Sequence, residues 1–310
     1  MSYRLGCVPY VNAIPLVRAF EAWDHAKARA EVVYAVPSEL PKLLESGEVD
    51  AILVSTFYAL TNPGLRMADG IGIASDGLVK SVRLFSKVAP HEIKSLCLDQ
   101  SSMTSNALAQ IILNERYGVK PTLVKALPSL DQMLEIADAC VIIGDEGMAV
   151  DAGDLFVLDL GDEWKHHTGK PFVWATWVGR EGLTPALAML LQTAAHWSLL
   201  GQGNHPHLLE SILRKILRME EPTLDAPFLA LKEERLHECI VTAKHQVAWP
   251  DEAIRDYLEN VMIYNLDALV MDGLRMYQEK LLANGFENAI HFPALIGGSV
   301  GELSSFLERA

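Results

Sequence analysis

The sequence predicts an α/β protein with two lobes and a cleft between them, and three observations lead to this class. The length of 310 residues suits two domains of about 150 residues each. In the first part of the chain, short apolar strand-like runs alternate with helical patterns, which favours parallel sheets with helices on both faces. After Thr184 the pattern becomes wholly helical, so we expect a helical C-terminal tail that packs on one lobe.

Strands are expected where short runs are apolar, alternate in polarity or are rich in β-branched side chains. These runs are 4–8, 31–36, 51–54, 71–74, 81–85, 95–98, 122–126, 140–143, 155–158 and 173–178. Helices are expected where apolar residues recur at helical spacing, with Pro15 in the first turn of one helix and Gly118 past the end of another. These segments are 14–23, 38–44, 104–117, 130–137, 185–200, 208–217, 226–244, 252–262 and 266–282.

The middle block of alternating elements, at about 90–175, looks self-contained, and its flanks are strand-like rather than flexible. This pattern predicts that the chain crosses twice between the lobes. We expect lobe I to consist of residues 1–88 and 178–310, including the C-terminal helices, and lobe II of residues 89–177. The active site is then expected in the cleft between the lobes, because ligands of open α/β sheets bind outside the carboxyl ends of strands.

Composition excludes several classes of partner. The net charge is −14, from 26 Lys and Arg against 40 Asp and Glu, and such an acidic chain repels phosphate backbones, so we expect no nucleic acid partner. No run of about 18 uncharged apolar residues occurs, so we expect no membrane span. The first residues contain no extended apolar segment with a cleavage site, and the four cysteines are far apart. We therefore expect a cytoplasmic protein with reduced, buried cysteines.

Three polar segments lie at the ends of predicted strands, where a side chain either caps the next helix or faces a ligand. Asn12 lies in the first segment, two residues after Tyr10, and its position alone favours the cap. Ser55 and Thr56 form the second, for which a helix cap and a ligand contact are equally expected. Ser81 lies near the expected crossing to the second lobe, where an exposed strand edge is the alternative.

A hydroxyl-rich segment opens the helix expected at 104–117. It contains Ser101, Ser102, Thr104 and Ser105, whereas an ordinary cap needs only one hydroxyl. Free backbone N–H groups at a helix start, together with hydroxyl donors, can bind an anion without a cation nearby. These residues therefore predict a site for a carboxylate ligand.

Two further segments are less specific. Gly144 and Asp145 follow a strand, and Gly144 would let the backbone approach a ligand, although a purely structural role in the loop is at least as well supported. Phe172 begins an aromatic segment that either walls a cleft or fills a core, and the second is usual.

His166 and His167 are adjacent without a third ligand nearby, so we expect a solvated loop and no metal site.

Six motifs occur in the order typical of one enzyme family. They are Val-Pro-Tyr-Val-Asn-Ala-Ile-Pro-Leu at 8–16, Ser-Glu-Leu-Pro-Lys-Leu-Leu-Glu-Ser-Gly-Glu-Val-Asp-Ala at 38–51, Ser-Val-Arg-Leu-Phe-Ser-Lys at 81–87, Leu-Asp-Gln-Ser-Ser-Met-Thr-Ser-Asn-Ala-Leu at 98–108, Ile-Ile-Gly-Asp-Glu-Gly-Met at 142–148 and Thr-Gly-Lys-Pro-Phe-Val-Trp-Ala at 168–175. The chain resembles the MqnA family, the chorismate dehydratases of the futalosine route to menaquinone. The resemblance covers roughly residues 3–200 and resumes at 257–285.

The resemblance implies a two-lobed type II periplasmic-binding-protein-like fold that serves as an enzyme, a carbon–oxygen lyase. It implies that chorismate loses water to give 3-[(1-carboxyvinyl)oxy]benzoate, without a cofactor, because formation of the aromatic ring drives the reaction. Asn12 and Ser81 match the family's two polar active-site positions, and Thr104 and Ser105 match its carboxylate-binding segment. The expected substrate-binding residues are Tyr10, Ser55, Thr56, Ser102, Thr104, Ser105, Gly144, Asp145 and Phe172.

The segments expected to form the cleft contain no histidine and no lone carboxylate placed as a base. We therefore hypothesise that the enolpyruvyl carboxylate of the substrate takes the proton, while Asn12 and Ser81 orient it and hydrogen-bond to the departing hydroxyl. The sequence departs from the family pattern at Arg83, where an apolar residue is more usual, and over about 203–250, which is longer and more helical.

Two alternative functions remain open at this point. One is a solute-binding or sensor protein of the same fold without catalysis. The other is the related dihydroxynaphthoate synthase, whose family uses a histidine in the second lobe, although residues 139–148 here contain none. The partner expected for the favoured function is the small molecule chorismate, bound by a monomer or homodimer.

Overall fold

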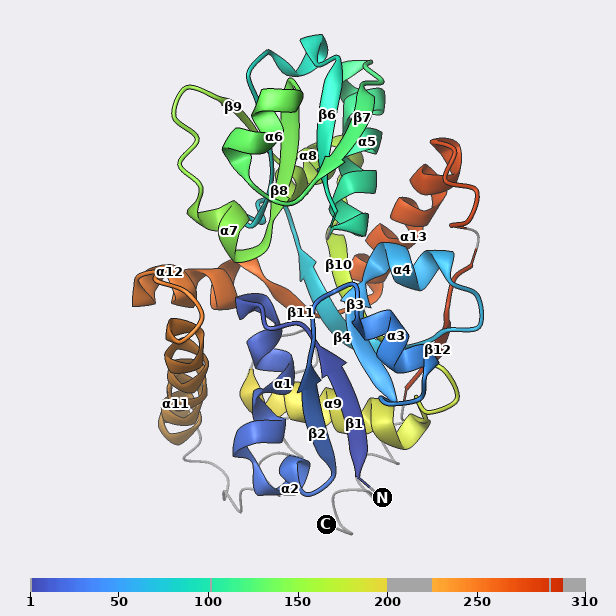
Figure 1. Cartoon of the computed structure of the whole chain (residues 1–310). Coiled ribbons are helices and arrows are strands. Elements are labelled where there is room, and N and C mark those ends of the chain that lie inside the picture. The colour runs from blue at the N-terminus through green and yellow to red at the C-terminus, as the bar shows by residue number, and fades with distance from the viewer. Residues whose placement is uncertain (1, 101, 200–224, 290, 298–310) are drawn as a thin grey trace.

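The computed structural model describes residues 2–100, 102–199, 225–289 and 291–297. Two β-sheets lie one above the other in Figure 1, and helices pack on the faces of both. No helix among the described residues is long and apolar enough to cross a membrane. We call the part built on the larger sheet lobe I and the part built on the smaller sheet lobe II.

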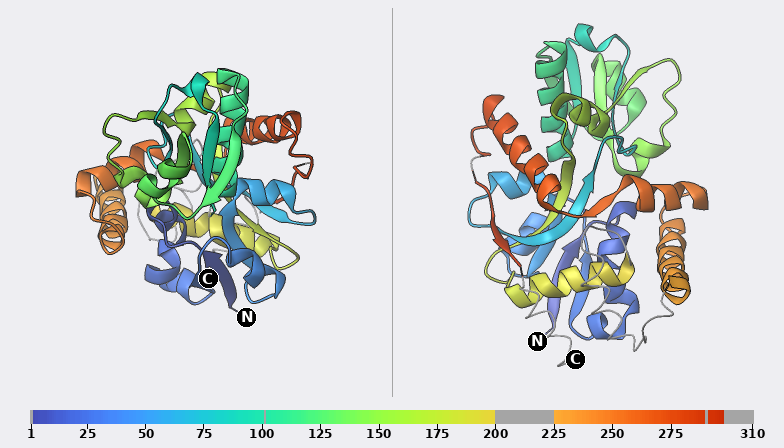
Figure 2. Two further views of the ribbon diagram at one scale, coloured as in Figure 1. Left: turned by 45° about the horizontal axis from the view of Figure 1, so that its top comes forward. Right: turned by 180° about the vertical axis from the view of Figure 1, so that it is seen from behind.

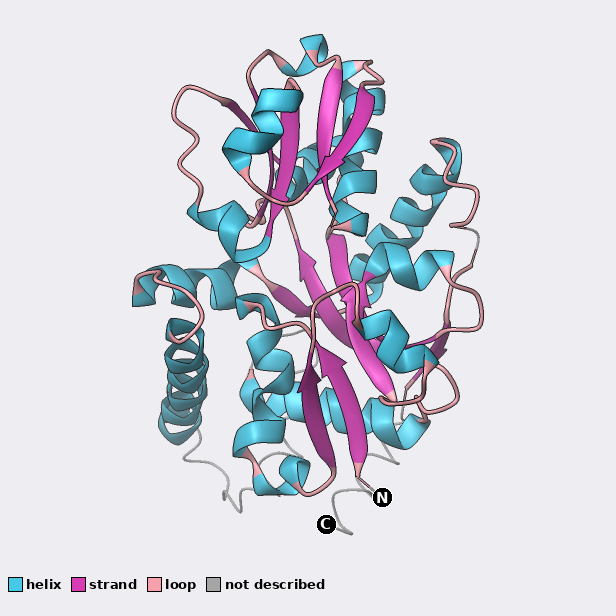
Figure 3. Cartoon of the chain, in the orientation of Figure 1, coloured by secondary structure: helices cyan, strands magenta, loops and turns pink. Residues whose placement is uncertain are grey.

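The sheet of lobe I has seven strands in the order β11-β4-β10-β3-β1-β2, and β12 also pairs with β4. Their bounds are β1 (Tyr3–Cys7), β2 (Ala30–Tyr34), β3 (Ala51–Ser55), β4 (Arg66–Ser75), β10 (Phe172–Gly179), β11 (Ile263–Asn265) and β12 (Ala294–Ile296). Neighbours β2, β1 and β3 are parallel, as predicted, whereas β10 runs antiparallel to both β3 and β4. The sheet is therefore mixed, because β10 enters it from the other lobe (Figure 3).

The sheet of lobe II has five strands in the order β7-β6-β8-β5-β9. Their bounds are β5 (Val82–Ser86), β6 (Ser95–Asp99), β7 (Thr122–Ala126), β8 (Ala139–Ile143) and β9 (Phe156–Asp159). Strands β7, β6 and β8 are parallel, and β5 is antiparallel to β8 and β9. Each sheet thus combines parallel strands with an antiparallel strand that begins just after a crossing. This strand is β10 in lobe I and β5 in lobe II.

Helices surround both sheets, and short polar signals set several of their ends. In lobe I these are η1 (Val11–Ala13), α1 (Ile14–Ala22), α2 (Asp24–Lys27), α3 (Leu40–Glu45), α4 (Thr56–Thr61), α9 (Pro185–Ser198) and α13 (Ala268–Ala283). In lobe II they are η2 (Pro90–Glu92), α5 (Met103–Tyr117), α6 (Leu130–Ile136), α7 (Gly144–Ala149) and α8 (Leu160–Thr168). Thr184 caps α9 through its side chain, and Gly118 ends α5 with a φ of +69°, a value that glycine adopts at little cost.

Three further elements, orange in Figure 1, begin with α11 upright at the side of lobe I and continue with α12, which runs from there towards the centre of the molecule. They are α11 (Asp225–Lys244), α12 (Asp251–Asp256) and the π-helical turn η3 (Tyr257–Val261). Helix α11 contacts α1 and α9. Seen from behind in Figure 2, α9 and α13 lie across the sheet of lobe I, where they contact β4 and β10.

The strand pairing differs from the expected lobe boundaries at 88 and 177. Strand β5 (Val82–Ser86) pairs in the smaller sheet, and β10 (Phe172–Gly179) pairs in the larger one. The chain therefore crosses at 76–81 and returns at 169–171, several residues before each expected boundary. An apolar strand pattern shows that β5 is a strand, but it carries no information about the sheet that the strand joins.

The prediction of a wholly helical C-terminal part is wrong at two short strands, β11 and β12. Both add to the edge of the sheet at β4. A three-residue strand is too short for its polarity pattern to be recognised, and its pairing partner lies far away in the sequence. The helix expected at 208–217 lies outside the described residues.

The core explains why the two lobes form one body. One cluster of buried apolar side chains includes Leu5 and Ile52 of lobe I as well as Leu108 and Val141 of lobe II. All four cysteines are buried and free, which agrees with their prediction as small apolar residues. A second, smaller cluster lies on the other face of the lobe II sheet.

Candidate functional site

A cavity of about 110 Å³ lies where carboxyl ends of strands from both sheets meet. By the same measure a single water needs about 10–15 Å³, so the space suits a small organic molecule. It is lined by Val8, Tyr10, Asn12, Pro37, Leu40, Leu53, Val54, Ser55, Ile73, Val79, Ser81, Val82, Ser102, Met103, Thr104, Ser105, Ile143, Gly144, Trp174 and Ala175. These residues come from both lobes and from the first crossing.

Helix starts converge on this cavity from four strand ends. Strand β1 leads into η1 and α1, β3 into α4, β6 into α5, and β8 into α7. The lining includes no Lys, Arg or His side chain, so the positive ends of helices and the free N–H groups supply the favourable potential for an anion. The longest of these helices is α5, and its N-cap residue Ser102 makes no side-chain capping bond.

The hydroxyl groups of α5 behave differently from one another. Ser102, Thr104 and Ser105 are all buried and all line the cavity. The Thr104 hydroxyl, however, accepts a hydrogen bond from the backbone N–H of Phe57 at 3.0 Å. This bond joins α5 of lobe II to α4 of lobe I, so Thr104 also holds the lobes together.

Ser55 and Thr56 follow the same strand but point in different directions. Ser55 lines the cavity, and its hydroxyl accepts the N–H of Tyr58 at 3.4 Å, so the expected helix cap is confirmed and the ligand contact stays a prediction. Thr56 does not line the cavity. It is fully buried, and its hydroxyl donates to the carbonyl of Val173 at 2.8 Å, which ties α4 to β10.

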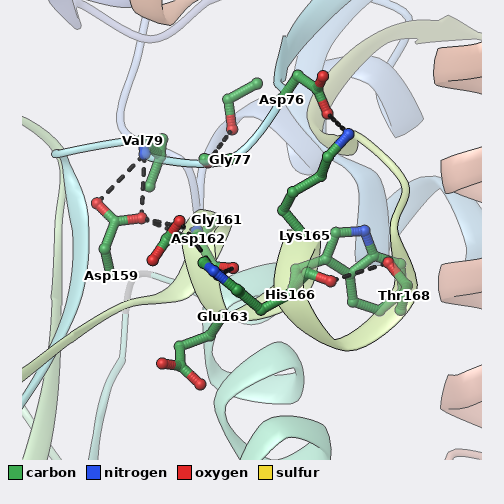
Figure 4. Close-up of polar contacts among 12 residues, drawn as sticks. Asp76, Gly77, Val79, Asp159, Gly161, Asp162, Glu163, Lys165, His166 and Thr168 are labelled. Carbon is green, nitrogen blue, oxygen red and sulfur yellow. Dashed lines mark hydrogen bonds and ion pairs between the residues drawn. The ribbon is translucent and has the colours of Figure 1, made fainter.

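Ser81 follows a turn at the first crossing that the Asp159 carboxylate holds in place. We call this carboxylate, together with the N–H groups that it accepts, the clamp. The carboxylate of Asp159 accepts the backbone N–H groups of Val79 at 3.0 Å and Lys80 at 2.7 Å, and it also caps α8 through Gly161 and Asp162 (Figure 4). Lys80 has a φ of +63°, which is unfavourable for a residue with a side chain.

The same carboxylate therefore fixes a strained turn directly before Ser81. Burial raises the pKa of Asp159, and its backbone N–H partners oppose that shift. Beside the clamp, Lys165 forms an ion pair with Asp76 at 2.5 Å (Figure 4).

Asn12 and Ser81 are connected through a tyrosine that the residue patterns did not identify. The Tyr257 hydroxyl lies 2.7 Å from the Ser81 hydroxyl oxygen and 3.4 Å from the Asn12 amide nitrogen. Tyr257 begins η3, and 176 and 245 residues separate it from these partners. Its only signal in the sequence was its place at the start of the resumed family resemblance at 257–285.

Gly144 and Asp145 approach the cavity from α7. Gly144 lines it with a φ of +67°, a backbone conformation that glycine adopts at little cost, and its approach to a ligand stays a prediction. Asp145 is not among the lining residues. Burial raises the pKa of its carboxyl to about 6, while a hydrogen bond from the backbone N–H of Val11, in lobe I, opposes the shift. Tyr10 lines the cavity, and its pKa is raised by burial and then by the nearby carboxylates Asp99 and Asp145.

The aromatic segment of β10 both fills the core and walls the cavity. Phe172 does not reach the cavity, because its ring is buried among Trp164, Trp174 and Tyr277. Trp174 lines the cavity instead, and its indole N–H donates to the Ser75 hydroxyl at 3.0 Å. Phe172 and Trp174 share one face of β10, so the strand pattern cannot distinguish them, and only packing in the folded chain shows which ring lines the cavity.

Arg83 points away from the cavity. Its guanidinium donates to the carbonyls of Gly147 and Val150 and lies over the Phe85 ring at 4.8 Å. The arginine therefore supports α7 and leaves the cavity without a cation.

Among the described residues, no group of three or more His, Cys, Asp or Glu side chains could hold a metal ion. His166 and His167 lie on the last turn of α8 rather than in the expected loop. His167 contacts the carboxylate of Glu115 at 2.5 Å, which also receives the ammonium of Lys280.

The sequence is similar to known proteins over most of its length. The model of a family described as "Menaquinone biosynthesis" matches residues 3–282. Chorismate dehydratase from Thermus thermophilus is 31% identical over 255 residues, which are 71% of this chain and 90% of the relative.

Two solved structures are similar in fold. Protein AF1704 from Archaeoglobus fulgidus has a TM-score of 0.63 at 16% identity, over 92% of this chain and 98% of that one. A Candida albicans gene product, CA3427, described as having the generic periplasmic binding protein fold, has a TM-score of 0.54 at 13% identity, over 95% and 97% of the two chains. At these identities the structures show the fold alone, and they agree with the predicted periplasmic-binding-protein-like architecture.

Proposed function

The chain belongs to the menaquinone biosynthesis family, and from this premise we propose that it is an enzyme, a chorismate dehydratase. The observation that carries the proposal is the cavity between the lobes, where Asn12 and Ser81 share one tyrosine among converging helix starts. A dianion such as chorismate fits this environment because helix N-termini and hydroxyl groups stabilise carboxylates without a basic surface.

The proposed reaction removes the hydrogen on C3 and the hydroxyl on C4 of chorismate. The electrons of the C3–H bond form the new ring double bond as the C4–O bond breaks. The base that takes the C3 proton passes it to the departing hydroxide, which leaves as water. The ring becomes aromatic, which supplies the driving force. The enolpyruvyl ether and both carboxylates remain in the product.

The base in this scheme is the enolpyruvyl carboxylate of the substrate. Tyr10 is the one lining residue with an ordinarily titrating side chain, and its raised pKa keeps it protonated near neutral pH. The substrate carboxylate, attached next to C3, needs only to be oriented towards that hydrogen. We assign this orientation to Asn12 and assign hydrogen bonding to the departing hydroxyl to Ser81.

The proposal is tested by incubating purified protein with chorismate. We expect a new aromatic absorbance and a product lighter than chorismate by one water, detected by mass spectrometry. Binding of chorismate without turnover would contradict the proposal and support the solute-binding alternative.

The residue assignments are tested with Asn12→Ala and Ser81→Ala. Each removes a preorganised donor, so we expect kcat to fall by about 10²–10³. Ser46→Ala is a matched control, because the exposed Ser46 hydroxyl lies at the end of α3 and donates to the nearby carbonyl of Leu43 and carboxylate of Glu48. Wild-type rates in both cavity variants would refute the assignments.

A further inference from the structure

The hydrogen bonds around Tyr257 have a defined direction. A phenol is a stronger acid than an alcohol, so the Tyr257 O–H donates to the Ser81 oxygen. The Asn12 amide can only donate through its nitrogen, and it donates to the Tyr257 oxygen. The order is therefore from the Asn12 amide to Tyr257, and from Tyr257 to Ser81.

This order leaves the Ser81 hydrogen free. Among the described residues, the Ser81 hydroxyl donates to no protein acceptor, although it is only 2% exposed and lines the cavity. A serine hydroxyl has one hydrogen, which rotates to suit its partners. Because Tyr257 occupies one lone pair of the oxygen, rotation is restricted and the remaining hydrogen is available to an acceptor in the cavity.

Several contacts hold Tyr257 in place. Its side chain is 1% exposed, and its ring lies edge-on to Trp249 with centroids 5.7 Å apart. It begins a π-helical turn, a feature often found at functional sites. The preceding residue, Asp256, pairs with Lys80 at 2.5 Å, directly beside Ser81. Burial also raises the pKa of Tyr257, so its hydroxyl remains a donor.

We propose that Tyr257 is a positioning residue that orients the Ser81 hydroxyl so that its hydrogen faces the reacting group of the substrate. This inference rests on the proposed dehydratase function and deepens it. Tyr257 acts through Ser81 and needs no contact with the substrate. Asn12 supports the arrangement from η1 of lobe I, so the orientation of the Ser81 hydroxyl on the crossing depends on contacts with lobe I.

The test is a double-mutant cycle measured on chorismate turnover. Tyr257→Phe removes one oxygen and keeps the ring, and we expect kcat to fall by about tenfold while KM changes little. If Tyr257 acts through Ser81, adding Tyr257→Phe to Ser81→Ala lowers kcat by less than about twofold further. A purely structural role would instead lower kcat by the same factor in both backgrounds.

Tyr264→Phe is the matched control. Tyr264 is equally buried, at 2% exposed, and its hydroxyl has no hydrogen-bond partner among the described residues, so we expect wild-type kcat. The melting temperature of each variant verifies the fold. Unchanged kcat in Tyr257→Phe, or equal losses in both backgrounds, overturns this inference alone. A wild-type protein that does not dehydrate chorismate overturns the proposed function, and this inference with it.

Discussion

Asp145, on α7 of lobe II, accepts a hydrogen bond from the backbone N–H of Val11 in lobe I. Burial raises the pKa of its carboxyl from the usual 3.8 to about 6, although the Val11 N–H favours the ionised form. The folded chain therefore holds the Asp145 proton more tightly than the unfolded chain does. This carboxyl supports folding fully below about pH 3.8, and the support is lost as the pH rises through about 6.

Replacement of Asp145 by Asn is expected to stabilise the protein at alkaline pH. The amide oxygen still accepts the Val11 N–H, but no buried charge forms. We expect Asp145→Asn to melt about 2 °C above the wild type at pH 8, and the difference to shrink towards zero near pH 4. Thermal unfolding followed by circular dichroism across this range is the measurement.

Asp138→Asn is the control of opposite sign. The backbone N–H groups of Lys94 and Ser95 donate to the Asp138 carboxylate and lower its pKa, so the carboxylate stabilises the fold above its usual pKa and that support is lost as the pH falls. We expect this variant to be less stable than the wild type at pH 8 and closer to it at pH 3. Equal pH profiles for Asp145→Asn and the wild type would refute the account of Asp145.

At the scale of elements, the first crossing is the segment whose geometry the site depends on most. Asp159 joins it to α8 by accepting N–H groups from both. The clamp stabilises the positive φ of Lys80 and so sets the position of Ser81. Gly161 permits the close approach, because a Cβ there would lie 2.4 Å from the carbonyl of Gly77.

Asp159→Ala is expected to lower both stability and activity. Loss of a cap and of the bonds to the crossing should cost about 2 kcal/mol of unfolding free energy. We also expect kcat to fall, because Ser81 loses its fixed position. Urea unfolding and chorismate turnover measure the two effects.

Thr184→Ala provides the comparison. Thr184 also caps a helix, through Leu187 N–H at 3.2 Å, but it lies on α9, away from the crossing. We expect it to lose about 1 kcal/mol and to keep the wild-type kcat. A similar loss of kcat in both variants would show that destabilisation, rather than the crossing, controls activity.

At the scale of the whole molecule, the two lobes are expected to unfold together. One apolar cluster includes residues of both, the chain crosses twice, and the Phe57 N–H binds the Thr104 hydroxyl between them. We predict a single calorimetric transition. Reaction product at about 100 times its Kd should add about 2.7 kcal/mol to the unfolding free energy, since it binds only the folded protein. Two transitions, with product shifting only one, would contradict this prediction.

The sequence by itself determined most elements and two of the three residues of the proposed catalytic arrangement, Asn12 and Ser81 but not Tyr257. The predicted strand at 122–126 agrees in both bounds with β7, and Asn12 and Ser81 are recognisable because they lie at strand boundaries within family motifs. Such signals are local, since strand alternation, helical spacing and capping all act over a few residues. The short helices α7 and α8 were missed because each follows a strand with no break between them, whereas α4 was expected only through the possible cap at Ser55 and Thr56.

Only the tertiary structure decided which sheet each crossing strand joins and which side chains reach the cavity. Strand β5 pairs in lobe II, Thr56 and Phe172 turn into the core, and Tyr257 joins Ser81 across 176 residues. These outcomes depend on pairing and packing between distant segments, which no local pattern encodes. The residue types therefore indicated which functional groups the site contains. Which of these groups meet in the cavity depended on how the chain folds.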